Sequence, residues 1–583
     1  MSFLTRLRRP AAPPDADGAG PDDGAGPDDG AGPDQEGPDQ EGPDQEGPAA
    51  AEGERPRWRT VVAWVLTVLS AAAVLAALVL PNKLDLLTVR EFLYIPVEAL
   101  AGAVLLLLLP PRGRRIFALV VGPLLGALVI VKLLDMGFFS ILDRPFDLVL
   151  DWVLFDDALT VLKGSVGEGG VVATVVGAIL LAIAVLVLAT LSVIRLTSVV
   201  PRSRGAVAWI ACAILGALLV TNAPIATQRS AILVYERAGM VRDGLRDRQL
   251  FAEEAKVDAF RDTPDDQLLT ALRGKDVVLA FVESYGRDAV EDPEFSGQVG
   301  AVLDTGYGRL RTAGYGARSG YLTSSTSGGG SWLAHATFLS GLWVDNQQRF
   351  RTVTSSDRLT LVSAFRRAGW RTVGVMPGIT RAWPEGDFYG YDQVYDLPNL
   401  GYRGPGFGWA TMADQYTMVA YERFEHAKTD RGPVFATIPL VSSHSPWAPL
   451  PRFIDWNQVG DGSIYHEIRK EGLNAEEVWR DQTRVRTEYR RSIEYTLTVL
   501  TSYIETYGDD DLVVIFLGDH QPSPLVAGDD AGHDVPISIV ARDPAVLERI
   551  AGWGWQDGLR PGPQSPVWPM STFRDRFLTA YGS

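Results

Sequence analysis

The sequence predicts an α/β protein: a transmembrane domain of five helices followed by a domain with a mostly parallel sheet flanked by helices. Two observations predict this fold class. Long apolar runs fill residues 60–225, and from Lys275 onward short apolar runs alternate with helical stretches. An α-helix of about 20 apolar residues spans a hydrocarbon core of about 30 Å. Strands that alternate with helices are typical of a parallel sheet.

Residues 1–56 have a different composition from the rest of the chain. After a short basic patch they repeat Gly, Pro, Asp and Glu, as in GAGPDD and PDQEG, and they contribute much of the formal charge of −17. Such a segment has almost no apolar side chains whose burial could offset the entropy of ordering. We expect a disordered cytoplasmic tail that serves as a solvated spacer or binds a partner.

The five apolar segments that we expect to cross the membrane make residues 57–225 a transmembrane domain. They cover residues 60–80, 92–110, 115–134, 171–194 and 205–224. Arg-rich loops lie before the first segment, between the second and third, and between the fourth and fifth. The positive-inside rule therefore predicts a cytoplasmic N-terminus and an extracytoplasmic position for everything after residue 225. The Arg-, Ala- and Gly-rich composition suggests a bacterium, so we expect a multi-pass protein of the bacterial plasma membrane.

Two further segments complete this topology. Residues 136–162 alternate apolar and acidic side chains, and we expect an amphipathic helix along the membrane surface. If that segment crossed the membrane instead, residues 226–583 would lie inside the cell. Residues 226–273 are charged and helix-prone, so we expect a stalk between the membrane and the domain formed by residues 274–583.

Composition also limits the chemistry. The sequence has one cysteine, Cys212, which lies inside an apolar run. An intramolecular disulfide and a thiolate zinc site are therefore excluded, and a metal ion would need Asp, Glu, His or hydroxyl ligands. The domain carries no basic stripe, so we expect no nucleic-acid partner.

Polar side chains follow several of the predicted strands. Glu283 lies in VESYGRD, His444 in SSHSPW, and Asp519 and His520 in LGDHQP. Because parallel strands align their carboxyl ends at one edge of a sheet, residues distant in sequence meet there. Each residue alone could be a loop or capping residue, but the set predicts a metal site. The strands that we expect cover residues 276–284, 372–378, 434–443, 512–520 and 535–543.

The segment TSSTSGGGSWLAHATFLSG, residues 323–341, predicts a tight glycine turn before a helix that begins near Ser331. A helix N-terminus presents free N–H groups and favours an anion such as phosphate or sulfate. Ser331 could instead cap the helix. Ser325, Thr326 and Ser327 are alternative nucleophiles.

In this order, VESYGRD, GGGSWLAHATFLSG, SSHSPW and LGDHQP resemble the motifs of the alkaline phosphatase and sulfatase superfamily. With membrane segments ahead of them, the chain looks most like the membrane-anchored lipoteichoic acid synthase and phosphoethanolamine transferase branch. The resemblance implies that one divalent metal ion is bound by Glu283, Ser331, Asp519 and His520, with Ser331 also acting as the nucleophile. It further implies catalytic or substrate-contacting roles for His444 and His533, and head-group contacts for Arg381 and Trp383. One departure is the serine, because this branch usually has threonine as its nucleophile.

These residues predict an enzyme. A bound dication lowers the pKa of a serine hydroxyl, and the oxygen and imidazole ligands suit Mn²⁺, Mg²⁺ or Zn²⁺. The resemblance implies a phosphoryl or phosphoalkyl transferase, of the phosphoglycerol or phosphoethanolamine type, with a covalent seryl intermediate. Its partners would be a membrane lipid donor in the bilayer and a cell-envelope acceptor.

Two alternatives stay open. One is an envelope sulfatase or phosphatase-type ester hydrolase, although SWLAH lacks the Pro and Arg of the Cys/Ser-x-Pro-x-Arg motif that formylglycine sulfatases modify. The other is an inactive lipid-binding relative with a structural or signalling role.

Overall fold

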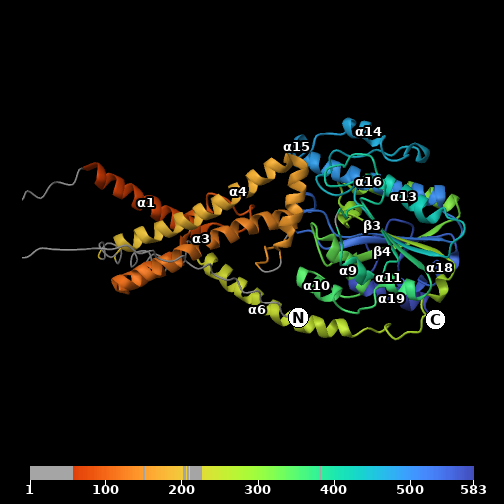
Figure 1. Cartoon of the computed structure of the whole chain (residues 1–583), viewed down its shortest axis with the longest axis horizontal. Helices are drawn as coiled ribbons and strands as arrows, with labels where there is room; N and C mark the ends of the chain where they lie inside the picture. Colours follow the sequence, from red (N-terminus) through yellow and green to blue (C-terminus); the bar gives the residue numbers. More distant parts are fainter. Residues whose placement is uncertain are drawn as a thin grey trace, which may run out of the picture. The chain divides into compact units, whose positions relative to one another are not determined.

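The computed structural model describes residues 57–142, 144–148, 151–200, 205, 209, 226–380, 382–528 and 530–583. The chain divides into two compact units, Met1–Thr60 and Val61–Ser583. The second unit contains most of the apolar helices and the whole sheet (Figure 1).

Three described helices are long and apolar enough to cross a membrane, judged by length and composition. The candidate spans are Trp58–Val79 within α1 (Arg57–Val79), Pro111–Leu142, which is the whole of α3, and Gly167–Val199 within α4 (Val153–Val199). They coincide with three of the predicted segments, 60–80, 115–134 and 171–194. Gly167, with φ 71° and ψ 176°, interrupts α4 at the point where its apolar part begins.

The other two predicted spans are not confirmed. Segment 92–110 contains only α2 (Val97–Leu108), whose 12 residues correspond to about 18 Å at about 1.5 Å per residue, too short for a hydrocarbon core. Pro96 precedes α2 in the extended conformation as part of β1 (Ile95–Pro96), which pairs with β2 (Ala226–Thr227). Almost all of segment 205–224 lies outside the described residues.

The expectation of a single amphipathic helix over residues 136–162 is wrong. Helix α3 continues to Leu142, a non-helical stretch includes Arg144 and Pro145, and α4 begins at Val153. Pro145 disfavours helical backbone at the residue before it and lacks an amide to donate. The Asp151 carboxylate then holds the turn, because it accepts hydrogen bonds from both terminal nitrogens of Arg144 at 2.7 Å.

Beyond the apolar helices, the described strands form a nine-stranded sheet in the order β10-β4-β9-β8-β3-β7-β5-β6, with β11 beside β4. Strands β8, β3, β7, β5 and β6 run parallel, while β9 is antiparallel to β8 and β4 is antiparallel to β9. The mostly parallel sheet and the five predicted strands are therefore confirmed. The bounds are β3 (Asp276–Val282), β4 (Gly316–Thr323), β5 (Arg371–Met376), β6 (Gln393–Asp396), β7 (Val434–Leu440), β8 (Leu512–Gly518), β9 (Asp534–Ala541), β10 (Gln556–Asp557) and β11 (Val567–Pro569).

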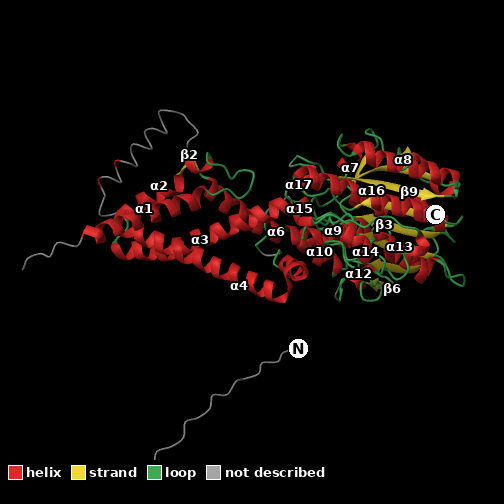
Figure 2. Cartoon of the chain, turned by 90° about the horizontal axis from the view of Figure 1, so that it is seen from above, coloured by secondary structure: helices red, strands yellow, loops and turns green. Residues whose placement is uncertain are grey.

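Helices cover both faces of this sheet (Figures 1 and 2). Alternate residues of β3 show why: Val278 and Ala280 belong to one buried core, and Val277 and Leu279 to the other. A strand buried on both faces reads as a continuous apolar run, as this one does. The first core includes residues of α8 (Ser296–Thr312), α13 (Asp414–Tyr421) and α16 (Gln482–Tyr507); the second includes residues of α9 (Ser331–Ser340), α11 (Leu361–Arg367) and α19 (Phe573–Tyr581).

The remaining described α-helices are α6, a long helix that precedes the sheet, and several short helices. Their bounds are α6 (Arg229–Lys256), α7 (Asp288–Glu291), α10 (Gln347–Thr354), α12 (Gly386–Tyr389), α14 (Tyr465–Glu471), α15 (Ala475–Val478), α17 (Pro524–Ala527) and α18 (Pro544–Glu548).

Candidate active site

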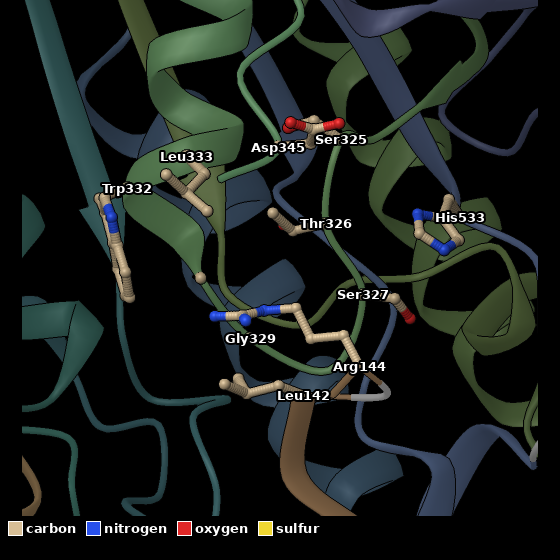
Figure 3. A pocket seen from close by; sticks show the side chains of 11 residues that line it. Leu142, Arg144, Ser325, Thr326, Ser327, Gly329, Trp332, Leu333, Asp345 and His533 are labelled. Atoms are coloured by element: carbon tan, nitrogen blue, oxygen red, sulfur yellow. The ribbon is translucent and has the colours of Figure 1, made fainter. Parts of the chain in front are cut away.

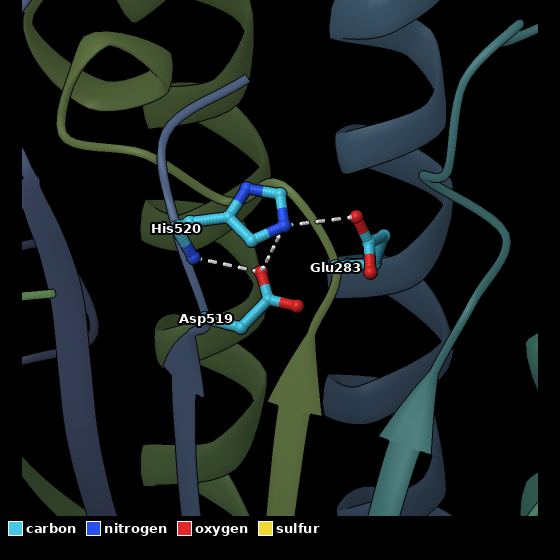
Figure 4. A group of neighbouring side chains, drawn as sticks. All are labelled: Glu283, Asp519 and His520. Atoms are coloured by element: carbon cyan, nitrogen blue, oxygen red, sulfur yellow. Dashed lines mark hydrogen bonds and ion pairs between the residues drawn. The ribbon is translucent and has the colours of Figure 1, made fainter. Parts of the chain in front are cut away.

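The site begins where two neighbouring strands end. Strands β3 and β8 are parallel and in register, with Val282 opposite Gly518. Glu283 and Asp519, the residues that follow, therefore lie side by side at the carboxyl edge of the sheet. His520 comes next in the chain, and ligand atoms of Glu283, Asp519 and His520 all lie within 4.8 Å of one another (Figure 4).

The backbone at this edge is held in unusual conformations. Ser284 adopts a positive φ of 56°, and its amide N–H donates to Asp519 Oδ1 at 2.8 Å. Positive φ is costly for a residue with a side chain and tends to occur at functional sites. Gly518 is required nearby, since a Cβ there would lie 1.9 Å from the Tyr285 carbonyl oxygen. The turn after β3 thus passes close over the end of β8 and aims both carboxylates at one point.

His520 is oriented by its own loop. Its Nδ1 lies 2.7 Å from the Gln521 carbonyl oxygen, which can only accept a hydrogen bond, so Nδ1 carries the proton. Once Nε2 is deprotonated, as metal binding requires, its lone pair faces the carboxylates, since Nε2 lies 3.3 Å from Glu283 Oε1 and 3.8 Å from Asp519 Oδ1. A histidine with a backbone acceptor on one nitrogen and carboxylates around the other has the arrangement that metal-ligating histidines use.

Ser331 reaches the same point from a different element. It is the first residue of α9, after Gly330 in the left-handed conformation at φ 81°. Its hydroxyl donates to Glu283 Oε2 at 2.9 Å and lies 3.2 Å from His520 Nε2. The hydroxyl makes no capping hydrogen bond, because Gly330 occupies the N-cap position. The capping role considered for Ser331 is therefore wrong.

The alternative hydroxyls have other surroundings. Ser325 Oγ is buried and lies 2.8 Å from Thr337 Oγ1, which joins the loop to the body of α9. Thr326 Oγ1 is buried without a hydrogen-bond partner in the described part of the chain. The Ser331 hydroxyl contacts Glu283 and His520. The described hydrogen bonds of the alternative hydroxyls do not reach the Glu283–Asp519–His520 group.

Crowding of charge perturbs all three members of that group. Burial and the neighbouring Glu283 carboxylate raise the pKa of Asp519 to about 7. Burial alone would also raise the pKa of Glu283, but His444 and His520 nearby hold that pKa well below its ordinary value. Burial opposes the charged form of His520, yet Asp519 and Glu283 outweigh it and raise the pKa of His520 to about 9. The negative charges of Glu283 and Asp519 are therefore balanced by bound protons or by histidine cations.

A divalent cation fits this donor set. No Arg or Lys forms an ion pair with Glu283 or Asp519 among the described residues, and the nearby basic groups are histidines. Two carboxylates, one imidazole nitrogen and one hydroxyl are hard and borderline donors of the kind that Mn²⁺, Mg²⁺ and Zn²⁺ accept. The predicted ligands Glu283, Ser331, Asp519 and His520 are therefore brought together.

His444 lies in the turn after β7, close enough to Glu283 to lower the pKa of that carboxyl. Its Nδ1 is 2.8 Å from the Ser445 carbonyl oxygen, and its ring centroid is 5.1 Å from that of Trp409. The preceding residue anchors the turn, because the Ser443 hydroxyl donates to the Glu283 carbonyl oxygen at 2.6 Å. The turn that carries His444 is thereby tied to the residue that carries a predicted metal ligand.

A pocket opens at the glycine loop that precedes Ser331 in the chain, and His533 lines it (Figure 3). Its walls come from the glycine loop and the start of α9, from Asp345, and from the end of α3 and the turn that follows. The lining residues are Leu142, Arg144, Ser325, Thr326, Ser327, Gly329, Gly330, Trp332, Leu333, Asp345 and His533. The glycines allow this approach, since a Cβ on Gly328 would lie 2.5 Å from the Ile141 carbonyl oxygen.

The two predicted head-group residues have different outcomes. Arg381 lies outside the described residues. Trp383 stacks on Tyr389, with ring centroids 5.6 Å apart, and packs against the second core. None of its described contacts reaches the Glu283–Asp519–His520 group.

One residue of the site was missed. His335 lies four residues after Ser331 on α9, and its Nε2 is 3.9 Å from Asp519 Oδ2. Burial lowers the pKa of His335 to about 3, so the imidazole is neutral. The helical spacing within SWLAH was the available signal, because residues four apart share one face of a helix.

The fold and this group of side chains define an α/β enzyme with a metal-type site at the carboxyl edge of its sheet. Residues 275–537 match the family model described as Sulfatase. Over these residues the chain is therefore similar to the sulfatase family, and we conclude that it is an enzyme. No curated protein matches the sequence.

The solved structures that match the chain include three bacterial proteins. The lipoteichoic acid synthase LtaP from Listeria monocytogenes is 15% identical, with 55% of this chain and 75% of that chain covered and a TM-score of 0.36. The periplasmic domain of EcEptC from Escherichia coli, in complex with Zn, is 12% identical (53% and 83% covered, TM-score 0.36). The Streptococcus pyogenes phosphoglycerol transferase GacH is 14% identical (57% and 90% covered, TM-score 0.32).

Proposed function

We propose that this chain is a metal-dependent phosphotransferase that moves a phosphoalkyl group, such as phosphoglycerol or phosphoethanolamine, from a membrane lipid to an envelope acceptor. One observation carries the proposal: the Ser331 hydroxyl lies at a helix N-terminus and bonds to Glu283 within the candidate metal group. Such a hydroxyl has an anion-binding helix end behind it and acidic ligands beside it. It is placed to act as a nucleophile toward a tetrahedral anion.

Glu283, Asp519, His520 and the Ser331 hydroxyl would hold the ion. When bound, a divalent cation supplies Lewis acidity, which lowers the pKa of the hydroxyl and neutralises charge on the anion. The chain's own residues do the rest. Glu283 Oε2 accepts the hydroxyl hydrogen bond at 2.9 Å and so orients Ser331 Oγ toward the anion.

The reaction balances in two displacements. In the first, a bond forms between Ser331 Oγ and phosphorus, the phosphorus–oxygen bond to the lipid breaks, and the lipid alcohol takes a proton. In the second, an acceptor hydroxyl attacks the same phosphorus, the bond to Ser331 Oγ breaks, and the serine regains its proton. His444, in the turn after β7, and His533, which lines the pocket, are candidates for contacting the substrate and carrying these protons.

The pocket at the glycine loop supports a lipid substrate. Leu142 and Arg144, at the end of the candidate membrane span α3 and just after it, form part of its lining. Arg144 is paired with Asp151 through one N–H of each terminal nitrogen, and its remaining Nη2 N–H would be the donor to a phosphate oxygen. A substrate held in this pocket would have its phosphorus near Ser331 and its apolar part toward the end of a membrane helix.

The proposal includes the topology and the domains. We propose a cytoplasmic tail over residues 1–56, a multi-pass membrane domain over 57–225, a stalk over 226–273 and an extracytoplasmic catalytic domain over 274–583. Arg-rich segments flank the apolar helices on one side, which supports a cytoplasmic N-terminus. The catalytic residues would then face the cell envelope, where lipid-linked acceptors occur.

The hydrolase is a second candidate, favoured by the match to the Sulfatase family model. Water would then replace the acceptor alcohol in the second displacement. Ser331 is followed by Trp-Leu-Ala-His, without the Pro and Arg that formylglycine formation requires. The described site therefore favours an unmodified serine and a phosphorus substrate over a sulfate ester.

Mass spectrometry of a trapped intermediate tests the proposal. The full chain, purified in detergent with Mn²⁺, would be incubated with phosphatidylglycerol or phosphatidylethanolamine, quenched in acid and digested. We expect a phosphoalkyl adduct on the peptide that contains Ser331, and none in Ser331→Ala. In a transferase, an added alcohol acceptor should receive the phosphoalkyl group in place of water. In a hydrolase, the added alcohol should leave the products unchanged. A metal-loaded chain that forms no adduct with any phospholipid or sulfate ester would instead indicate the inactive relative.

A further inference from the structure

His335 lies one turn after Ser331 on the same face of α9. Residues four apart on a helix are neighbours along its surface. Ser331 contacts Glu283 and His520, while His335 faces the remaining member of the group, with Nε2 3.9 Å from Asp519 Oδ2. One helix therefore presents a polar atom to each of the three predicted acidic or imidazole ligands.

Of the two atoms that face each other, the His335 nitrogen lacks a hydrogen bond. His335 Nε2 is buried without a partner in the described part of the chain. The backbone N–H groups of Ser284 and His520 both donate to Oδ1 of Asp519, and no described hydrogen bond reaches Oδ2. Buried polar atoms are nearly always paired, so the unpaired His335 nitrogen beside a carboxylate oxygen calls for a functional explanation.

Packing holds the imidazole in this position. Its ring lies against Phe281, with centroids 3.9 Å apart and planes at 30°. Phe281 belongs to β3, two residues before Glu283, and its own ring also contacts Phe338 of α9 at 5.5 Å. The ring of His335, on the same helix as Ser331, is thus held against the strand that precedes Glu283.

We propose that His335 is a positioning residue for Asp519: its Nε2–H donates to Oδ2 when the metal site is filled, and so sets the orientation of that carboxylate. This inference rests on the proposed metal site. Carboxylates that bind metal ions are themselves held by hydrogen bonds from surrounding residues, and losing such a bond weakens the metal site. The arrangement also couples the nucleophile to a metal ligand, because Ser331 and His335 move with the same helix.

The test measures Mn²⁺ affinity of the full chain in detergent by electron paramagnetic resonance titration, which needs no substrate. His335→Leu removes the donor, and we expect Mn²⁺ to bind about 10- to 100-fold more weakly. His335→Gln keeps an N–H donor and should recover most of the affinity. Phe338→Leu is the matched control, since it alters packing around Phe281 on the same helix without removing a polar atom, and it should bind Mn²⁺ as tightly as the wild type.

Melting temperatures of the metal-free proteins check that each variant folds. His335→Phe is a second donor-free variant, whose ring can keep the contact with Phe281 if the leucine variant is unstable. Wild-type Mn²⁺ affinity in both donor-free variants would overturn the inference and leave His335 as a packing residue. Equal losses in the leucine and glutamine variants would also overturn it, because they would make His335 a direct ligand. A wild-type chain that binds no Mn²⁺, Mg²⁺ or Zn²⁺ would instead refute the proposed metal site.

Discussion

Asp414 and Ser442 bond to each other in both directions beneath the turn that carries His444. The Asp414 amide donates to Ser442 Oγ at 2.9 Å, and the Ser442 amide donates to Asp414 Oδ1 at 2.9 Å. Thr496 of α16 donates to the other carboxylate oxygen at 2.6 Å. This fully buried acid therefore joins the turn after β7 to α13 and α16.

A first prediction follows from the charge of Asp414. Burial raises the pKa of Asp414 from 3.8 to about 6. Because the folded-state pKa is higher than the unfolded one, this group stabilises the fold fully below about pH 4 and loses that contribution as pH rises through 6. The loss corresponds to about 3 kcal/mol. Asp414→Asn should remove it, so the difference in melting temperature between wild type and variant should change between pH 4 and 7. Parallel curves would contradict the assignment.

Ser331 provides the second prediction. Ser331→Ala keeps Glu283, Asp519 and His520 as metal ligands and should bind the lipid but form no adduct, with turnover reduced by several orders of magnitude, each factor of ten being about 1.4 kcal/mol of barrier. Ser331→Thr should keep part of the activity, because its hydroxyl can occupy the same place. Ser325→Ala is the comparison variant: it loses a bond to Thr337 and should still form the adduct. Near wild-type turnover in Ser331→Ala would remove this residue from the mechanism.

Metal retention gives the third prediction. Glu283→Ala or Asp519→Ala should abolish stoichiometric metal in the purified chain, because each removes a buried carboxylate that no described neighbour replaces. Elemental analysis after dialysis measures the effect. Glu505→Ala, which removes a surface carboxylate paired with Arg309, should leave the metal content unchanged. Full metal content and activity in both site variants would place the metal elsewhere.

The fourth prediction concerns topology. An alkaline phosphatase reporter fused after Lys256, at the end of α6, should be active, since this enzyme folds only outside the cytoplasm and the Arg-rich flanks predict an external position. The same reporter fused after residue 56 should be inactive. Activity from the second fusion and not the first would reverse the orientation proposed for the whole chain.

The parts of the site that the sequence predicted share a physical cause. Strands β3 and β8 are buried on both faces, so they read as apolar runs, and their parallel register places Glu283 beside Asp519. Ser331 was predictable from the glycines before it. Strand β4 was not, because GARSGYLT mixes polar and small residues, with Ser319 buried and Gly320 beneath Trp555.

Other features depended on information that local patterns lack. Segment 92–110 is apolar enough for a span, but Pro96 shortens its helix. His335 gains its meaning only from Asp519, which lies far along the chain and meets it across the sheet edge. The apolar pattern of buried strands predicts which strands lie at the centre of the sheet. The contact between His335 and Asp519 joins a helix to a loop and could be found only in the folded chain.

The close approach of Gly328 to the Ile141 carbonyl oxygen has a practical consequence for enzymology. A water-soluble fragment that starts after α6 would retain Ser331 and the metal ligands, yet it would lack the wall of the pocket that Leu142 and Arg144 supply. Small chromogenic phosphodiesters should report normally on such a fragment, while long-chain lipids would have lost part of their binding surface. Substrate preferences measured without the membrane helices would then describe the chemistry of the enzyme and misstate its selectivity.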